Sequence, residues 1–204
     1  MNLNTLKQAE KTFLENYPGG FNNPQMLTLG KKHKMEQLEE FTNKSFSSDQ
    51  FDDITTIIAN AEKLVSRSTM VSLFEKPKFR DCLRSLNPKE QNQFAKGLFE
   101  LLHGDEQYGF ETLIELLGKY KLAKWSIITV FKAYYAPQKE VFIKPTTAKL
   151  IIEKLGLDLI YHPTPTWDFY KKFRTEINQL KNKVNKNLSP NNPAFCGFLM
   201  MALG

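Results

Sequence analysis

The stretch that decides the fold is Thr166–Asn187, which reads TWDFYKKFRTEINQLKNKVNKN. At 100° per residue, its apolar side chains fall within one sector about 80° wide. These side chains are Phe169, Phe173, Ile177, Leu180 and Val184. The residues before this stripe, Tyr161–Pro165, have the composition of a rigid extended connector, so the helix is expected to start near Thr166. We therefore predict a long helix over Thr166–Asn187 with one face in a hydrophobic core.

The same helical spacing recurs along most of the 204 residues, while runs that alternate with period two are nearly absent. These patterns predict an all-α protein of about nine to ten helices. One expected helix covers residues 25–43, and shorter ones cover 69–75 and 77–86. The only convincing extended segment is Val141–Pro145, where the proline holds the residue before it out of helical conformation.

Several polar residues are placed to begin helices, and glycines to end them. The expected cap residues are Ser48 or Asp49, Asn87 with Pro88 after it, and Thr146. Gly156 is expected to close the helix that Thr146 opens. The apolar run 194–203 is half the length that a bilayer requires, and we expect it to form a last helix docked into the core.

The length and composition are those of one compact globular domain over residues 1–204. The alternative is a division into two subdomains, an N-terminal helical one over 1–87 and a basic helical one over 88–204. Charge is distributed unevenly. Residues 1–118 hold 14 Lys and Arg against 17 Asp and Glu, whereas residues 119–204 hold 14 against 5, a balance of +9. This basic C-terminal part is compatible with an acidic partner.

Cys82 and Cys196 lie far apart, which predicts two reduced thiols in a cytoplasmic protein rather than a redox pair or a zinc site. The N-terminal residues lack the pattern of a secretion signal, and no membrane association is expected. Motifs for nucleotide hydrolysis, zinc peptidase and serine hydrolase chemistry are missing. The three histidines lie on separate segments, and we expect neither a metal nor a cofactor.

A second face of the 166–187 helix carries aromatic and cationic side chains in one sector: Trp167, Tyr170, Arg174, Asn178 and Lys181, with Lys171 just beyond. Nucleic-acid surfaces combine rings that stack on bases with cations that neutralise phosphates. The alternative is that Trp167 and Tyr170 pack against the connector Pro163–Pro165 while the cations only solvate the helix.

The segment Val141–Thr147 places Lys144, Thr146 and Thr147 together at a helix start. An ammonium group, hydroxyls and free N–H groups there predict an anion pocket, and the alternative is that Thr146 is only a cap.

Three stretches carry a resemblance to a known family. They are Leu116–Ile128, Val141–Thr147 and Leu155–Leu157, within Leu113–Leu157. Their order resembles the core of the helix-hairpin-helix DNA glycosylases, in which a hairpin between two helices precedes an extended segment and a third helix ending in Leu-Gly-Leu. The resemblance covers under a quarter of the chain. It implies an all-α scaffold with a DNA-facing cleft.

The chain departs from the family at its functional positions. Lys121-Leu122-Ala123 stands where the family has hairpin glycines, and Lys144 stands where it has a catalytic aspartate. Lys124 falls near the hairpin lysine that acts as the nucleophile in some members. The departures put glycosylase activity in doubt.

These observations favour a protein that binds DNA or RNA with little sequence preference. The candidate residues are Lys124, Lys144, Thr146, Thr147, Lys149, Trp167, Tyr170, Lys171, Arg174 and Lys181. An enzyme acting on nucleic acid is one alternative, and it requires an acidic residue close to Lys124 or Lys144. A helical module that binds another protein is the other, and it requires a broad exposed apolar patch.

Overall fold

The computed structural model describes residues 1–204 and is entirely helical, which confirms the all-α prediction. Eleven α-helices are present, one more than the upper end of the expected range. They are α1 (Leu3–Asn16), α2 (Pro24–His33), α3 (Met35–Ser45), α4 (Ile54–Arg67), α5 (Glu75–Ser85), α6 (Pro88–His103), α7 (Glu106–Lys119), α8 (Trp125–Tyr135), α9 (Pro145–Leu155), α10 (Trp167–Lys181) and α11 (Asn192–Leu203). Three short 3₁₀ helices, η1 (Gly20–Asn22), η2 (Ser48–Gln50) and η3 (Lys186–Leu188), complete the chain.

Two predicted helices have different bounds in the structure. The helix expected over 25–43 is divided into α2 and α3, because Lys34 adopts a left-handed conformation with φ 49°. The helix expected to reach Asn187 ends at Lys181, so Val184 lies beyond it. The segment expected to be helical over 69–75 forms turns instead, and α5 begins only at Glu75.

Two of the expected caps are wrong. Asp53, not Ser48 or Asp49, caps α4 by accepting a hydrogen bond from the backbone N–H of Thr56. Helix α9 begins at Pro145, since proline has the φ angle of a helix and needs no N–H partner there, and Thr146 therefore lies inside the first turn.

Other starts and ends are confirmed. Asn87 and Glu90 form a reciprocal capping box at the start of α6, with Pro88 as the first helical residue. The predicted start near Thr166 is confirmed, since α10 begins at Trp167, and the Thr166 side chain accepts a hydrogen bond from the N–H of Phe169. Gly156 closes α9 with φ 57°. Local sequence thus sets these boundaries, because the partners lie within one turn.

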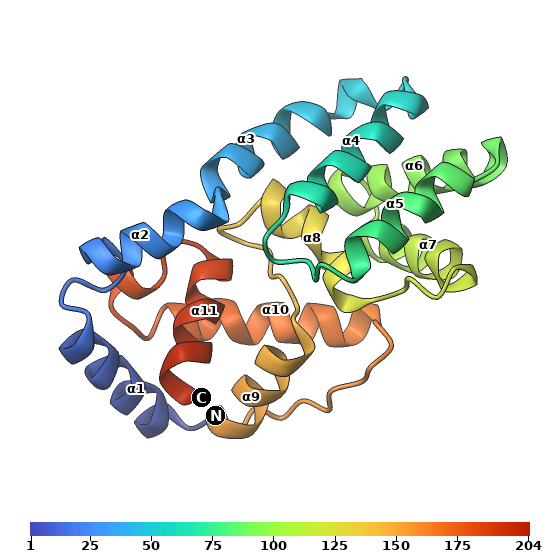
Figure 1. Ribbon diagram of the computed structural model, residues 1–204. Coiled ribbons are helices and arrows are strands. Elements are labelled where there is room, and N and C mark those ends of the chain that lie inside the picture. Colours follow the sequence, from blue (N-terminus) through green and yellow to red (C-terminus); the bar gives the residue numbers. More distant parts are fainter.

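The helices pack in two groups. Helices α3–α8 form one group, in which α6 and α7 make a close helical hairpin. A Cβ atom on Gly109 would lie 2.2 Å from the backbone nitrogen of Leu101, so only glycine permits this approach. Helices α1, α9, α10 and α11 form the other group, seen in the lower part of Figure 1.

One hydrophobic core of 48 buried residues runs through both groups. The chain ends lie close together in Figure 1, because α1 packs on α9 and α11. The backbone N–H of Asn2 donates to the carbonyl oxygen of Leu155 at 2.6 Å. Helix packing therefore does not follow a boundary near Asn87.

Helix α11 is docked into the core as expected, with Phe195, Phe198 and Leu199 buried. A helix able to cross a membrane is not found in this structure.

Both cysteines are buried and free, which confirms that they are not linked. Burial raises the pKa of the Cys82 thiol to about 11 and that of Cys196 to about 12. Because the thiolate is the reactive form, we expect both thiols of the native protein to react slowly with a disulfide reagent at pH 8. After denaturation, titration is expected to find two reactive thiols per chain. Rapid reaction of both in the native protein would contradict this burial.

Candidate nucleic-acid interface

The aromatic and cationic flank of α10 faces the protein interior. Tyr170 is fully buried, and its hydroxyl donates to Glu140 Oε2 at 2.7 Å. Arg174 Nη1 lies 2.9 Å from Glu106 Oε2 and 2.9 Å from Glu140 Oε1. The expectation that Tyr170 and Arg174 present an open surface is therefore corrected, because two carboxylates from other segments hold them.

Lys132, in the middle of α8, completes this arrangement. Its side chain is only 4% exposed, and its Nζ lies 3.0 Å from Glu106 Oε1 and 3.6 Å from Glu140 Oε1. It also donates to the carbonyl oxygen of Leu101 at 3.2 Å. Glu106, Lys132, Glu140 and Arg174 thus form an ion cluster whose two positive and two negative charges balance. We call it the buried ion cluster, because Lys132 and Glu140 at its centre are each only 4% exposed, while Arg174 and Glu106 are partly buried.

The pKa values follow from burial and pairing. Burial acts to raise the pKa of Glu106, but attraction to Lys132 and Arg174 outweighs it, so this pKa lies below its ordinary value. Burial lowers the pKa of Lys132 despite the two carboxylates beside it. For Tyr170, burial and the Glu140 carboxylate raise the pKa well above 10.

The remaining members of the flank also make internal contacts. The half-buried Trp167 ring packs 5.6 Å from the rings of Phe110 and Tyr170, so Phe110 of α7 provides a packing partner in addition to any contact with the connector. The Arg174 guanidinium lies 5.6 Å from the Trp167 ring.

Further along α10, polar groups bind the neighbouring turn and α11. Lys181 Nζ donates to Asn192 Oδ1 at 2.7 Å and to the carbonyl oxygen of Gln138. Asn178 donates to the carbonyl oxygen of Lys139 at 2.8 Å. This face therefore joins segments of the protein together.

The exposed candidate lysines gather at the starts of two other helices. Lys124 is the residue before α8 and Lys144 the residue before α9, and neither helix start has a side-chain cap. Both lysines and Thr146 are exposed, whereas Thr147 is only 8% exposed. At α8 the N–H groups of Ile127 and Ile128 donate to the carbonyl oxygen of Lys124, and the residues before them are buried. At α9 the N–H groups of Thr146 and Thr147 have no acceptor within the helix.

Two hydrogen bonds fix other segments to α8: one fixes the start of α5, and the other fixes the residue before Lys144. Ser126 Oγ, in the first turn of α8, donates to Glu75 Oε2 at 2.7 Å. Three residues on, Thr129 Oγ1 accepts from the backbone N–H of Ile143 at 3.0 Å. The start of α5 and the residue before Lys144 are thereby fixed to α8 within about two turns of Lys124. Figure 1 shows the starts of α5, α8 and α9 near one another at the centre of the molecule.

Two further candidate lysines are exposed. Lys149 of α9 places its Nζ 5.0 Å from the centre of the Tyr161 ring, and that ring packs 5.8 Å from Phe169. Lys171 on α10 has no contact that links it to the others. We use the name lysine site for Lys124, Lys144, Thr146, Thr147 and Lys149.

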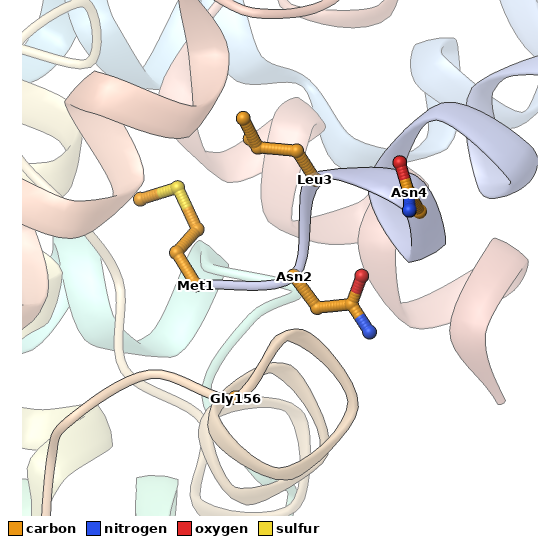
Figure 2. Close-up of a pocket in the computed structure, with 5 residues that line it drawn as sticks. All are labelled: Met1, Asn2, Leu3, Asn4 and Gly156. Carbon is orange, nitrogen blue, oxygen red and sulfur yellow. The ribbon is translucent and has the colours of Figure 1, made fainter.

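Two cavities lie away from the lysine site. Each has a volume of about 520 Å³. Figure 2 shows the first, lined by Gly156 and the residues Met1–Asn4 at the start of the chain. The second is lined by residues of α1, by Lys154 and by the end of α11. No candidate residue lines either cavity.

The histidines do not meet at a site. His33 Nδ1 lies 2.8 Å from Thr69 Oγ1, and His103 Nε2 lies 2.8 Å from the carbonyl oxygen of Phe46. No group of three or more His, Cys, Asp or Glu side chains is placed to hold a metal ion.

Comparison with known proteins gives no relative: no family model matches the chain, and no curated protein or solved structure is similar to it. The resemblance to the helix-hairpin-helix DNA glycosylases therefore stays a prediction.

The sequence interpretation missed Glu75, Glu106, Lys132 and Glu140. One feature could have revealed Lys132: it is the single charge in the apolar helix WSIITVFKAYY, and a buried ammonium group requires carboxylate partners. Nothing local indicates which carboxylates these are, since Glu106 is 68 residues from Arg174.

The buried ion cluster predicts a large difference between two cations of α10. Arg174→Met is expected to lower the free energy of unfolding by about 3–5 kcal/mol, because it leaves buried carboxylate charge without its partner. Lys172 pairs with the exposed Asp168 at 2.8 Å, and Lys172→Met is expected to cost less than about 1 kcal/mol. Urea unfolding measures both, and equal losses would contradict the cluster's role.

A second prediction concerns acid. The folded pKa of Glu106 lies below its ordinary value of 4.5, so its contribution to stability is complete above pH 4.5 and is lost as the pH falls through the folded pKa. The difference in unfolding free energy between the wild type and Glu106→Gln should therefore shrink as the pH falls below 4.5. Glu111→Gln on the exposed side of α7 is the control. A difference for Glu106→Gln that does not change with pH would argue against the shift.

Proposed function

We propose that the protein binds nucleic acid with little sequence preference, and that the lysine site carries this binding. The observation that supports the proposal is the pair of neighbouring helix starts, each preceded by an exposed lysine and lacking a side-chain cap.

A lysine before a helix is electrostatically unfavourable, because the positive end of the helix dipole repels the ammonium group. An anion reverses this effect, since it attracts the ammonium group and, at the start of α9, can accept a hydrogen bond from the backbone N–H of the exposed Thr146. At α9, the Thr146 hydroxyl adds an exposed donor. Phosphate oxygens are suitable acceptors for such a group.

The charge around the site remains basic once buried groups are set aside. Residues 119–204 have a balance of +9, and the buried Lys132, Arg174 and Glu140 account for +1 of it. The other residues of this part therefore carry +8. A surplus of this size favours an extended polyanion.

The shape of the site also favours a polyanion over a small phosphorylated molecule. Small ligands bind in concave pockets, whereas the lysine site extends over the starts of two helices. Its lysines lie at two helix starts and along α9. Contacts of this kind reach phosphates and carry no base information, so little sequence preference is expected.

One observation bears on the enzyme alternative. The Glu75 carboxylate lies near Lys124, since it accepts a hydrogen bond from Ser126, two residues further on. This carboxylate already accepts a hydrogen bond from the Ser126 hydroxyl, and Glu75 lines neither of the two cavities described above. We therefore propose binding rather than catalysis.

The protein-interaction alternative requires a broad apolar patch. The exposed large apolar side chains are instead spread over separate elements: Leu27 and Leu29 on α2, Leu73 and Phe74 before α5, Tyr108 on α7, Ile160 between α9 and α10, Met200 and Met201 on α11, and Met1 and Leu3 at the start of the chain.

Salt dependence tests the proposal. If Lys124, Lys144 and Lys149 each neutralise one phosphate, log affinity for duplex DNA should fall with log salt at a slope of about −3. The double variant Lys124→Gln/Lys144→Gln should bring the slope close to −1, equally for all sequences. Fluorescence anisotropy with labelled duplex DNA, single-stranded DNA and RNA measures these slopes.

The matched control is Lys44→Gln, because Lys44 is exposed on α3 in the acidic part of the chain. Its slope should equal that of the wild type. Absence of salt-dependent binding to all three nucleic acids at tens of micromolar protein would refute the proposed function.

A further inference from the structure

Two adjacent apolar side chains protrude from the turn that precedes α5. Leu73 is 77% exposed, and Phe74, at 83%, is the most exposed of the large apolar side chains. They lie between α4 and α5, directly before Glu75, whose carboxylate is fixed to the first turn of α8. The protrusion is thus connected to the helix that Lys124 precedes.

The backbone holds these side chains outward. The Ser72 side chain accepts a hydrogen bond from the N–H of Phe74 at 3.2 Å, and the Ser72 carbonyl oxygen accepts one from the N–H of Glu75 at 3.0 Å. Val71, just before, is buried in the core. The exposure of Leu73 and Phe74 is therefore built into an anchored turn.

The charges around the turn are mainly positive. Within residues 67–81 the basic side chains are Arg67, Lys76, Lys78 and Arg80, and the acidic ones are Glu75 and Asp81, which pairs with Arg80 at 2.9 Å. This balance of +2 stands within residues 1–118, whose overall balance is −3. An aromatic ring that protrudes among cations is complementary to a strand that offers both phosphates and unpaired bases.

We propose that Phe74 is the base-stacking residue of the lysine site. Its ring stacks on an unpaired base of single-stranded nucleic acid while Lys124 and Lys144 contact the phosphates. This inference rests on the proposed function and names its substrate class. Trp167, the ring expected from the sequence to stack, is packed against Phe110 and Tyr170 instead.

The experiment compares Phe74 variants by anisotropy with a labelled 20-nucleotide single strand and the matching duplex. Phe74→Ala should weaken single-strand binding roughly 5- to 150-fold, the range of base–aromatic stacking, and leave the salt slope unchanged. Duplex binding should change less than twofold, because paired bases are already stacked. The side chain lies outside the core, so the variant is expected to fold like the wild type.

Two more variants separate stacking from other apolar contacts. Phe74→Trp should bind the single strand at least as tightly as the wild type, and Phe74→Leu, which keeps an apolar side chain without a ring, should behave like Phe74→Ala. Leu27→Ala is the control, since Leu27 is 50% exposed on α2, and its affinity should not change.

The possible failures are distinguishable. Salt-dependent wild-type binding that Phe74→Ala leaves unchanged would overturn this inference and keep the lysine site. Phe74→Leu binding as tightly as the wild type would overturn stacking. Self-association of the wild type in light scattering, lost in Phe74→Ala, would show that the turn contacts a second copy of this chain. Absence of any wild-type binding would refute the proposed function itself.

Discussion

The structure depends on how one buried charge is satisfied. Lys132 lies inside α8 among core residues, and an ammonium group there is tolerated only with carboxylate partners. Glu106 comes from α7, and Glu140 from the segment that follows α8. Arg174 of α10 then balances the second carboxylate. Because α7 and α8 belong to one helix group and α10 to the other, the buried ion cluster joins the two groups in a fixed register.

The contacts between the two helix groups also determine which cationic side chains stay exposed. Arg174 pairs with Glu106 of α7, and Lys181 binds Asn192 of α11, so the flank of α10 stabilises the packing of neighbouring helices. The free positive charge lies instead at the starts of α8 and α9 and around the turn before α5. The hydrogen bonds of Ser126 and Thr129 bring these starts together on α8. The packing that buries one group of cations therefore leaves another group exposed at the proposed binding site.

The sequence predicts what depends on near neighbours. The helical class, the cap at Asn87, the helix start near Thr166 and the end at Gly156 follow from residues within one or two turns. The division at Lys34 has no such local cause, because lysine is an ordinary helix former. At the site, the exposed lysines were among the predicted residues, but Tyr170 and Arg174 have partners 30 to 68 residues away. Helical spacing identifies a polar face, but it does not show whether that face meets solvent or a distant carboxylate.

The helix starts themselves separate structural from functional demands. Seven of the eleven α-helices begin with an Asn, Asp or Thr whose side chain accepts a backbone hydrogen bond. Lysine precedes α3, α8 and α9. At α3 that residue, Lys34, also ends α2, where a positive charge is favourable. The Glu75 carboxylate lies near Lys124 through its hydrogen bond with Ser126, but neither Lys124 nor Lys144 makes an ion pair within the chain. Since these two starts are neighbours, one anionic strand can compensate both, which is the physical basis of the proposed function.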